Sequence, residues 1–408
     1  MSEENQNRLL VIDDEVGICE FVGEVASDLR FDVRLTTRVE EFRNELAGFS
    51  PSVVVMDLQM PEIDGVELLR ELAAGGFSAS VILMSGMDSR VLSTAEHLGK
   101  SLGLKMAGVL PKPIMLEDLE TMLDKALSSS RSITAADLEQ ALVTRQVHVY
   151  YQPKARRIGN GWRVDAAEAL VRWRHPRFGL MLPDEFIPLA ERSGLIGALS
   201  DFVFKEVASQ IHNWQNMDRH FKVAVNCSAA LINDLAFPDR LAEIFKQAHV
   251  DTSMLVVEIT ESTAMSDPQV TMDILTRLRL KNFGLAVDDF GTGFSSLSQL
   301  YRMPFNELKI DLSFVREMVN DPEAHTIVET LVVMAKKLGM QVCAEGVENS
   351  EALALLGDMN CDSVQGFLIS PAVPANRFLE VAMAWNSHGD PSNKGDNVIR
   401  MRAKSSDD

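Results

Sequence analysis

The feature that most limits the fold of this chain is a repeated alternation of short apolar runs with longer amphipathic stretches. In the first part of the chain the apolar runs span residues 9–12, 32–35, 53–56, 81–84 and 108–110. Helical patterns such as 66–72 and 116–127 lie between or after them. Strands that alternate with helices predict a parallel sheet covered on both faces. We therefore expect residues 1–127 to form a flavodoxin-like doubly wound α/β domain.

The alternation resumes on a larger scale after a serine-rich break. We interpret residues 128–136 as a linker, although the preceding helix could continue into it. The strand-like runs that follow span 147–151, 164–169, 222–225, 254–259, 285–287, 307–310 and 341–344. With helical stretches between them, this pattern predicts a TIM-like (β/α) barrel over 137–385. The polar tail 386–408 is expected to be disordered.

Charge and cysteine content narrow the function. The 408 residues include 39 Lys and Arg against 59 Asp and Glu, a net charge of −20, which opposes non-specific binding to DNA. The four cysteines are far apart in sequence, which favours reduced thiols over disulfides or a zinc site. No apolar run approaches the roughly 18 residues that a membrane span needs, and the acidic N-terminus is unlike a secretory signal. We therefore expect a soluble, cytoplasmic protein that does not bind membranes.

Polar side chains end the strands of the first domain. Asp13 and Asp14 follow the first run, Asp57 the third, Ser85 the fourth and Lys112 the fifth. Since ligands of doubly wound sheets bind outside the carboxyl ends of the strands, these groups are expected to converge. One such Asp alone is usually a turn former or helix cap. Together they predict a Mg²⁺ and phosphate site in which Asp57 acts as a nucleophile that forms an acyl phosphate.

The same pattern recurs in the predicted barrel. Seven polar residues lie in or directly after its strand-like runs: Glu168, Asn226, Glu258, Asp288, Asp289, Lys309 and Glu345. One of them alone would more often be a helix cap, but barrel strands share one mouth, so all seven can converge. An oxygen-only donor set favours Mg²⁺ or Mn²⁺, and a pair of ions suits phosphodiester cleavage. Lys309 could orient the water or stabilise charge, and Glu345 could bind the second ion or take a proton.

A tight loop follows the acid pair Asp288-Asp289. Its residues Gly291, Thr292 and Gly293 make it a candidate active-site loop, although a lone GTG is weak evidence for phosphate binding. Glu261 is a candidate to hold that loop by accepting backbone hydrogen bonds. The alternative is that Glu261 caps the helix that starts near Asp267.

The first domain resembles the receiver domain of two-component response regulators. The resemblance rests on VIDDE at 11–15, MDLQMP at 56–61, MSG at 84–86 and PKP at 111–113. It implies that a sensor histidine kinase phosphorylates Asp57, that Asp13, Asp14, Asp57 and the Gln59 carbonyl hold one Mg²⁺, and that Ser85 and Lys112 bind the phosphoryl group. The chain departs from the family at Val109, where an aromatic switch residue is usual, and this puts the usual relay in doubt.

The second domain resembles the EAL family of cyclic di-GMP phosphodiesterases. The matching motifs are YQP at 151–153, EALVRW at 168–173, FIPLAE at 186–191, NCS at 226–228, EITE at 258–261, DDFGTGFSS at 288–296, KID at 309–311, AEGVE at 344–348 and QGF at 365–367. The resemblance implies two-metal hydrolysis of cyclic di-GMP to linear pGpG. The catalytic residues would be Glu168, Asp289, Lys309 and Glu345. The substrate-side residues would be Gln152, Arg172, Lys309, Asp311, Glu348 and Gln365. There is one mild departure from the family. After QGF the chain reads Leu-Ile-Ser-Pro-Ala, whereas the family often has a basic residue directly before the proline.

Three functions compete. The leading one is an active phosphodiesterase, often homodimeric in this family, that phosphorylation of Asp57 regulates. The second is a non-catalytic cyclic di-GMP receptor that signals through protein contacts, which the intact metal-ligand positions oppose. The third is a transcriptional response regulator. The net charge of −20 and the lack of a third, helix-turn-helix domain oppose it.

Overall fold

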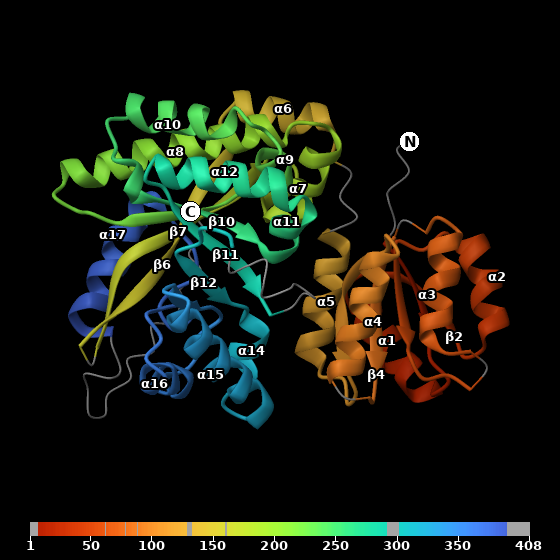
Figure 1. Cartoon of the computed structure of the whole chain (residues 1–408). Coiled ribbons are helices and arrows are strands. Elements are labelled where there is room, and N and C mark those ends of the chain that lie inside the picture. Colours follow the sequence, from red (N-terminus) through yellow and green to blue (C-terminus); the bar gives the residue numbers. More distant parts are fainter. Residues whose placement is uncertain are drawn as a thin grey trace. The chain divides into compact units, whose positions relative to one another are not determined.

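The computed structural model describes residues 7–61, 63–77, 79–87, 89–128, 133–159, 161–291 and 302–389. The chain divides into two compact units, Met1–Ile133 and Thr134–Asp408 (Figure 1). Each unit is described by itself below. The proposed loop residues Thr292 and Gly293, most of the serine-rich break and the tail 390–408 lie outside the described residues.

The N-terminal unit is the predicted doubly wound domain. Its strands are β1 (Arg8–Ile12), β2 (Asp32–Thr36), β3 (Val53–Asp57), β4 (Ser80–Ser85) and β5 (Lys105–Pro111). They form one parallel sheet in the order β2-β1-β3-β4-β5. The helices are α1 (Val16–Asp28), α2 (Val39–Phe49), α3 (Gly65–Ala74), α4 (Ser89–Ser101) and α5 (Leu116–Ser128).

The two faces of this sheet bury separate hydrophobic cores. Leu9 and Val11 of β1 lie in one core with residues of α1 and α5. Leu10 and Ile12 lie in the other, with residues of α2, α3 and α4. Successive side chains of a strand point to opposite faces, so a strand covered on both faces must be apolar throughout. Polar side chains of this sheet therefore lie at the ends of the strands.

The C-terminal unit begins with α6 (Ala135–Val143) and is built around a ten-stranded sheet. The strands are β6 (Val147–Ile158), β7 (Gly161–His175), β8 (Gly179–Met181), β9 (Lys222–Asn226), β10 (Leu255–Thr260), β11 (Gly284–Phe290), β12 (Glu307–Ile310), β13 (Gln341–Ala344), β14 (Ser363–Gln365) and β15 (Val373–Pro374). The longer helices are α7 (Pro183–Arg192), α8 (Ile196–Asn216), α10 (Phe237–Gln247), α12 (Pro268–Leu280), α15 (Pro322–Lys337), α16 (Ser350–Asp358) and α17 (Ala375–Ala384). The shorter ones are α9 (Ala229–Ile232), α11 (Glu261–Ser266) and α14 (Leu312–Glu317).

The predicted barrel is confirmed, but one of its strands runs against the others. The eight strands β6, β7 and β9 to β14 close a ring, in which β6 is antiparallel to both β7 and β14 and the remaining neighbours are parallel. The physical reason is the connection. A short loop joins β6 directly to β7, whereas parallel neighbours need a long crossover.

The interior of the barrel is unusually polar. Leu255, Val257 and Ile259 of β10 pack outward into the core under the helices. Glu258 lies between them in sequence and therefore points inward. Ala286 is the partner of Glu258 in the neighbouring strand, and like Ala224 and Cys343 it is small and buried. Two lysines, Lys154 and Lys309, are also buried in the barrel.

The described chain continues past the predicted start of the disordered tail. Residues Trp385–Gly389 form a π-helical turn, labelled η2. The Asn386 side chain accepts a hydrogen bond from the Val164 backbone N–H at 2.7 Å and donates one to the Val164 carbonyl at 3.0 Å. The expectation of disorder is thus wrong for residues 386–389, because a side-chain amide there completes the backbone pairing of β7.

The sequence predicts reduced cysteines and no membrane-spanning segment. All four cysteines are buried and none forms a disulfide. Within the described part of the chain, no helix combines the length and the apolar character that a membrane crossing requires.

Candidate active site

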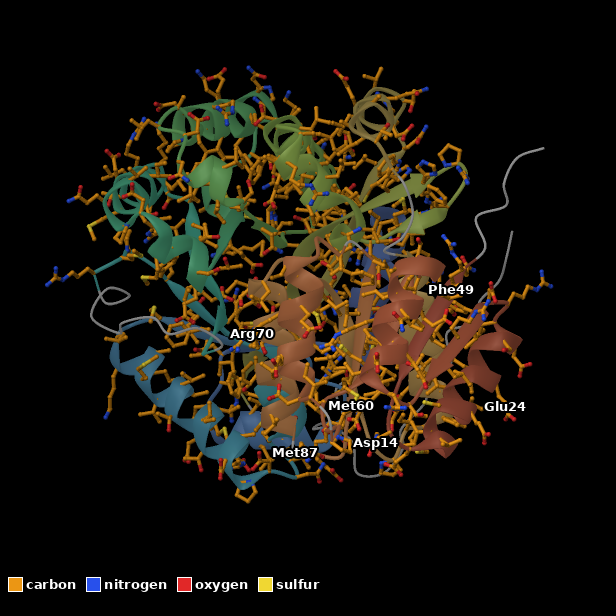
Figure 2. All side chains as sticks on the ribbon, turned by 90° about the vertical axis from the view of Figure 1, so that its right-hand side faces the viewer. Asp14, Glu24, Phe49, Met60, Arg70 and Met87 are labelled. Carbon is orange, nitrogen blue, oxygen red and sulfur yellow. The ribbon has the colours of Figure 1, made fainter. Side chains whose placement is uncertain are left out.

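The N-terminal unit gathers carboxylates at the carboxyl end of its sheet. Asp13, Asp14 and Asp57 each offer an oxygen, and these oxygens lie within 4.8 Å of one another. Figure 2 shows Asp14, Met60 and Met87, which follow β1, β3 and β4, grouped at one end of this unit. The sheet therefore brings together strand ends that are far apart in sequence.

Lys112 is the cation of this cluster. Its Nζ lies 2.8 Å from Asp57 Oδ2 and 2.9 Å from Asp13 Oδ2. Burial raises the pKa of Asp13, although Lys112 opposes the shift. Burial alone would lower the pKa of Lys112, but the hydrogen bonds and charges of the two aspartates raise it overall. Three carboxylates against one ammonium leave an oxygen-only donor set with excess negative charge, which fits a hard divalent cation.

Other predicted residues of this site have local roles. The Ser85 hydroxyl accepts a hydrogen bond from the Met87 backbone N–H at 3.0 Å. The Gln59 backbone N–H donates to Asp57 Oδ1 at 3.2 Å. Val109 is half-buried in β5 and packs against the core that β1 shares with α2, α3 and α4. The position therefore holds a packed aliphatic side chain where receiver domains usually carry an aromatic one.

The barrel brings all the predicted metal-site residues to one end. They come from six strands or the residues directly after them: Glu168 on β7, Asn226 on β9, Glu258 on β10, Asp288 and Asp289 on β11, Lys309 on β12 and Glu345 after β13. Gln152 on β6 and Gln365 on β14 join them through hydrogen bonds. The carboxyl ends of the parallel strands face this same mouth.

Lys309 stands at the centre of the carboxylates. Its side chain is only 1% exposed, and its Nζ lies 2.7 Å from Glu258 Oε2, 3.0 Å from Asp288 Oδ1 and 2.7 Å from Glu345 Oε1. Glu168 Oε2 is 3.7 Å away. Burial alone would lower the pKa of Lys309, but the surrounding carboxylates outweigh it and raise the pKa well above its usual value. The lysine is therefore a fixed positive charge.

Side-chain amides orient Glu168. Asn226 Nδ2 donates to Glu168 Oε1 at 2.7 Å. Gln365 Nε2 donates to Glu168 Oε2 at 2.5 Å and to Gln152 Oε1 at 3.0 Å. Four strands thus contribute to one hydrogen-bond network, and the carboxylate is held in one orientation before any ligand arrives.

An irregularity in β11 explains how two adjacent aspartates serve one site. Neighbouring residues of a regular strand point to opposite faces. Here the pairing of β11 with β12 shifts register between Val287 and Phe290, and Asp289 has a φ of 53°. A bulge of this kind redirects side chains. As a result Asp288, Asp289 and Glu345 offer oxygens within 4.8 Å of one another.

The site carries more negative charge than Lys309 can balance. Burial, followed by the charge of Asp288, raises the pKa of Asp289 to about 6. Burial also raises the pKa of Glu345 to about 7, against the opposing charge of Lys309. For Glu258 burial raises the pKa well above its usual value. Divalent cations would relieve this excess, and the oxygen and amide donors suit Mg²⁺ or Mn²⁺.

Two polar atoms at this mouth are buried without a partner. Among the described residues, Glu258 Oε1 and Gln365 Oε1 have no hydrogen-bond donor. An unsatisfied buried acceptor costs about 1–3 kcal/mol, so native proteins rarely retain one without a ligand or water to fill it. Both acceptors are therefore free to bind a cation or a water at this mouth.

The opposite end of the barrel makes a useful contrast. A cavity of about 380 Å³ there is lined by the ion pair of Lys154 with Glu307 and by charged residues such as Lys222 and Arg279. None of its lining residues has a buried polar atom without a partner. The buried pair of Lys154 and Glu307 is thus typical of a structural ion pair.

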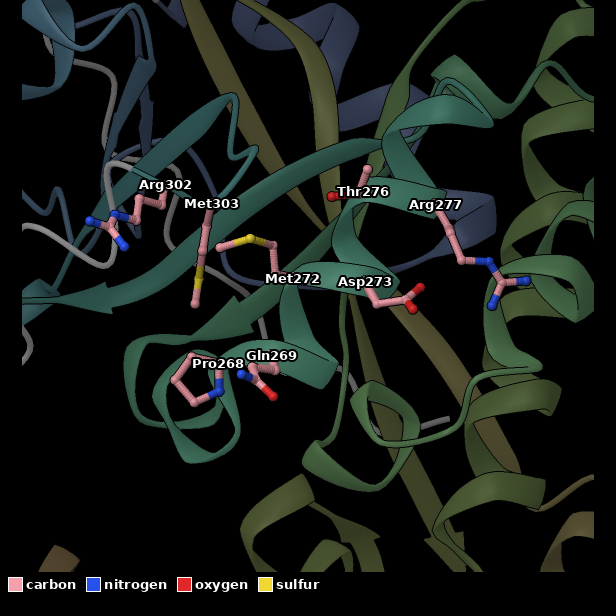
Figure 3. A pocket seen from close by; sticks show the side chains of 8 residues that line it. All are labelled: Pro268, Gln269, Met272, Asp273, Thr276, Arg277, Arg302 and Met303. Carbon is pink, nitrogen blue, oxygen red and sulfur yellow. The ribbon is translucent and has the colours of Figure 1, made fainter.

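Another cavity, of about 580 Å³, lies along the outer side of α12 (Figure 3). The side chains of Met272 and Met303 point toward one another there, and Asp273 is the only carboxylate in its lining. Of the predicted site residues that the structure describes, none lines this cavity, and its described lining lacks the donors for metal-assisted chemistry.

Glu261 binds the backbone directly after the strand that carries the acid pair. Its Oε2 accepts a hydrogen bond from the Gly291 backbone N–H at 3.1 Å. The competing interpretation, a cap on the next helix, is wrong, because Asp267 itself caps α12 by accepting from Gln269 and Val270.

Three predicted substrate-side residues form their hydrogen bonds and ion pairs with groups outside the carboxylate cluster. Arg172 donates to the Val171 carbonyl at 2.9 Å, and its guanidinium lies 5.9 Å from the centre of the Tyr150 ring. Asp311 caps α14 by accepting from the Ser313 backbone N–H at 2.9 Å. Glu348 pairs with Arg316 at 2.6 Å. Sequence reasoning missed Arg316, since an exposed arginine on a short helix carries no signal of its partner.

Two family models match the chain. The EAL domain matches residues 135–372, and the response regulator receiver domain matches residues 9–124. Each match corresponds to one of the two structural units.

Several characterised relatives are similar to this chain. The cyclic di-GMP phosphodiesterase RocR of Pseudomonas aeruginosa is 30% identical over 80% of this chain and 86% of its own length. The cyclic di-GMP phosphodiesterase PdeR of Escherichia coli is 36% identical over 59% of this chain. The bifunctional diguanylate cyclase/cyclic di-GMP phosphodiesterase MucR of P. aeruginosa is 38% identical over 60% of this chain. The chain spans only about a third of PdeR and MucR, which are matched over 36% and 35% of their length.

Solved structures resemble the C-terminal unit. The MucR phosphodiesterase in complex with c-di-GMP is 37% identical, with a TM-score of 0.57, and the match covers 60% of this chain and 98% of that one. An EAL domain protein from Listeria monocytogenes is 25% identical, with a TM-score of 0.54, and the match covers 62% of this chain and 98% of that one.

Proposed function

This chain belongs to the EAL domain family and also carries a receiver domain, and on that basis we propose that it is a response regulator that hydrolyses cyclic di-GMP. The observation that supports the activity most strongly is the buried cluster around Lys309, with Glu258 Oε1 left open. The similarity to RocR over most of both chains supports the same combination of domains.

In the proposed reaction, water cleaves one phosphodiester bond of the cyclic dinucleotide and pGpG is released. The six residues Glu168, Asn226, Glu258, Asp288, Asp289 and Glu345 would hold two Mg²⁺ or Mn²⁺ ions. Bound ions of this kind generate the nucleophile from water and stabilise the leaving oxygen. Lys309 supplies fixed positive charge where the phosphorane develops negative charge. The alternative role for Glu345 is to accept a proton at its carboxylate, which lies 2.7 Å from Lys309 Nζ.

We assign the substrate to the mouth around this cluster. Gln365 donates to Glu168 and to Gln152, and Arg172, Asp311 and Glu348 lie on the adjoining strands and loops. The fork of Arg172 suits a phosphate or the edge of a guanine. Glu261 and the loop Gly291, Thr292 and Gly293 would keep the acid pair in position.

The test is turnover by the purified protein. We expect conversion of cyclic di-GMP to pGpG with Mg²⁺ or Mn²⁺, measured by chromatography, and its loss in Glu168→Ala. Tight binding without turnover, also in the presence of beryllofluoride as a phosphoryl mimic, would instead identify a cyclic di-GMP receptor.

Removal of divalent cations is expected to abolish hydrolysis and to lower the melting temperature, because ions that bind only the folded state stabilise it. The measurement is pGpG formation and thermal unfolding after chelation and after re-addition of Mg²⁺ or Mn²⁺. Full turnover in the chelated protein would contradict the proposed metal site.

For the receiver unit, we propose that a sensor histidine kinase phosphorylates Asp57 and that this regulates the phosphodiesterase. Asp13, Asp14, Asp57 and the Gln59 carbonyl would hold one Mg²⁺, while Ser85 and Lys112 contact the phosphoryl group. The 2.8 Å contact between Lys112 and Asp57 supports this assignment. A homodimer is the proposed relay, and it would be tested by the oligomeric state with and without beryllofluoride.

Asp57→Asn is expected to remove phosphoryl uptake completely, because an amide is not a nucleophile toward a phosphoryl donor. The measurement is incorporation of label from a small acyl phosphate donor with Mg²⁺. Asp28→Asn, an exposed position at the end of α1, is the matched control and should be labelled like the wild type. Equal labelling of Asp57→Asn would place the phosphoacceptor elsewhere.

A further inference from the structure

Helix α14 contacts the backbone at two places next to the acidic residues of the barrel mouth, Gly291 and Gly346. It directly follows β12, which bears Lys309, and it begins at the cap Asp311 (Figure 1). Gly291 directly follows β11, which bears Asp288 and Asp289, and Gly346 lies in the segment 345–348 after β13.

The first contact is with the turn after the acid pair. Gly291 has a φ of 102°, and a Cβ placed on it would lie 3.0 Å from Phe314 Cε2. The half-buried Phe314 ring therefore lies directly against this backbone. On the other side, Glu261 accepts the Gly291 N–H. The turn is thus held between a ring of α14 and a carboxylate of α11.

The second contact is with the segment after β13. Gly346 has a φ of 69°, and a Cβ there would lie 2.6 Å from Leu312 Cβ. The segment is also hydrogen-bonded to the end of β14, because the Val347 N–H donates to the Gln365 carbonyl at 3.0 Å. Close approach at Gly346 therefore fixes the distance between α14 and the backbone that carries Glu345.

The third contact is an ion pair. Arg316 donates from Nε at 2.9 Å and from Nη2 at 2.6 Å to Glu348 Oε1. The two side chains are 47% and 41% exposed, so the pair contributes little to folding stability. Both nitrogens converge on one oxygen, which restricts the orientation of the Glu348 side chain at the rim of the mouth.

We propose that α14 sets the position of the segment 345–348 relative to the end of β11, with Phe314 packing against Gly291 and Arg316 acting as a positioning residue for Glu348. The inference rests on the proposed function, because Glu348 matters only if this mouth receives the substrate. Arg316 does not touch the carboxylate cluster in any hydrogen bond or ion pair of the described residues, so its effect on the reaction passes through Glu348.

The experiment compares Arg316→Ala, Arg316→Lys, Glu348→Gln and the double variant Arg316→Ala/Glu348→Gln in the full-length chain. Arg377→Ala is the matched control, since Arg377 pairs with Glu380 at 3.0 Å on the exposed side of α17. We expect Arg316→Ala to lower kcat/KM for cyclic di-GMP by about 10- to 100-fold, the range that a small misplacement costs. Arg316→Lys should recover part of the loss, and the melting temperature should stay unchanged in each variant.

The double variant separates positioning from an independent role. If Arg316 acts through Glu348, the double variant is no worse than Glu348→Gln alone. Losses that multiply, or an Arg316→Ala variant as active as Arg377→Ala, would overturn the inference while leaving the phosphodiesterase intact. If the wild type binds cyclic di-GMP without hydrolysing it, the same variants are compared by affinity, and an unchanged affinity in Arg316→Ala overturns the inference. A wild type that neither binds nor hydrolyses it overturns both proposals.

Discussion

Replacing Lys309 with methionine is expected to abolish hydrolysis and to destabilise the metal-free protein by about 3–5 kcal/mol, the usual cost of removing one partner from a buried ion pair. Lys309 Nζ lies within 3.0 Å of oxygens of Glu258, Asp288 and Glu345. Without it these buried carboxylates repel one another with no cation among them. The measurements are pGpG formation and denaturant unfolding in a chelating buffer.

Added Mn²⁺ should restore much of the stability of Lys309→Met but none of its activity. Ions bound by the carboxylates replace the missing charge, and their binding to the folded state adds to its stability. Turnover stays lost because the ammonium no longer stabilises charge on the phosphorane. Activity within a few-fold of wild type would show that Lys309 is structural only.

Lys154→Met is the matched control for this experiment. Lys154 is likewise buried in the barrel and paired with a glutamate, Glu307, but at the end away from the acid cluster. We expect a similar loss of stability that Mn²⁺ does not reverse. At temperatures well below its melting point, the variant should retain metal-dependent hydrolysis. The comparison separates loss of a buried lysine from loss of the site.

Glu258→Gln is expected to lower kcat by about 10³-fold. A metal contributes several kcal/mol to a phosphoryl transition state, and about 4 kcal/mol corresponds to three factors of ten. Glu258 is 1% exposed, one of its oxygens binds Lys309, and the other has no partner. An amide would present a donor in place of one acceptor and weaken the bound ion. The measurement is kcat together with Mn²⁺ affinity by calorimetry.

Glu307→Gln is the same substitution at the other end of the barrel. It should lower stability, because Lys154 then lacks its carboxylate, while Mn²⁺ affinity remains near that of the wild type. If Glu258→Gln and Glu307→Gln lowered Mn²⁺ affinity equally, Glu258 would not be a ligand and the effect would be one of general destabilisation.

Much of the architecture was predictable because a buried strand requires a short run of apolar residues, which is visible in the local sequence. A strand buried on both faces, such as β3, must be apolar throughout, and its polar neighbours then mark its ends. Asp57 and Lys112 are 55 residues apart, yet both follow such runs, so parallel pairing brings them to one edge. The same logic located Glu168, Glu258 and Lys309 at one mouth.

The direction of a strand was harder to predict where no helix separates it from the next strand. The runs 147–151 and 164–169 predict two strands, but nothing in their residue pattern indicates that β6 pairs antiparallel to both its neighbours. Likewise the tail was expected to be disordered from Asn386, because its composition is polar. The hydrogen bonds of that side chain to Val164, 222 residues earlier in the chain, are not visible in composition.

By itself, the sequence determined the two domains, their fold classes and the set of acidic, amide and lysine residues at the strand ends, since these follow from residue types at local spacings. The tertiary structure alone decided three things: the β11 bulge that turns Asp289 toward Asp288 and Glu345, the central place of Lys309 among the carboxylates, and the pairing of Arg316 with Glu348. Each depends on register and packing between segments that are distant in the chain, and residue types at local spacings do not specify those distances.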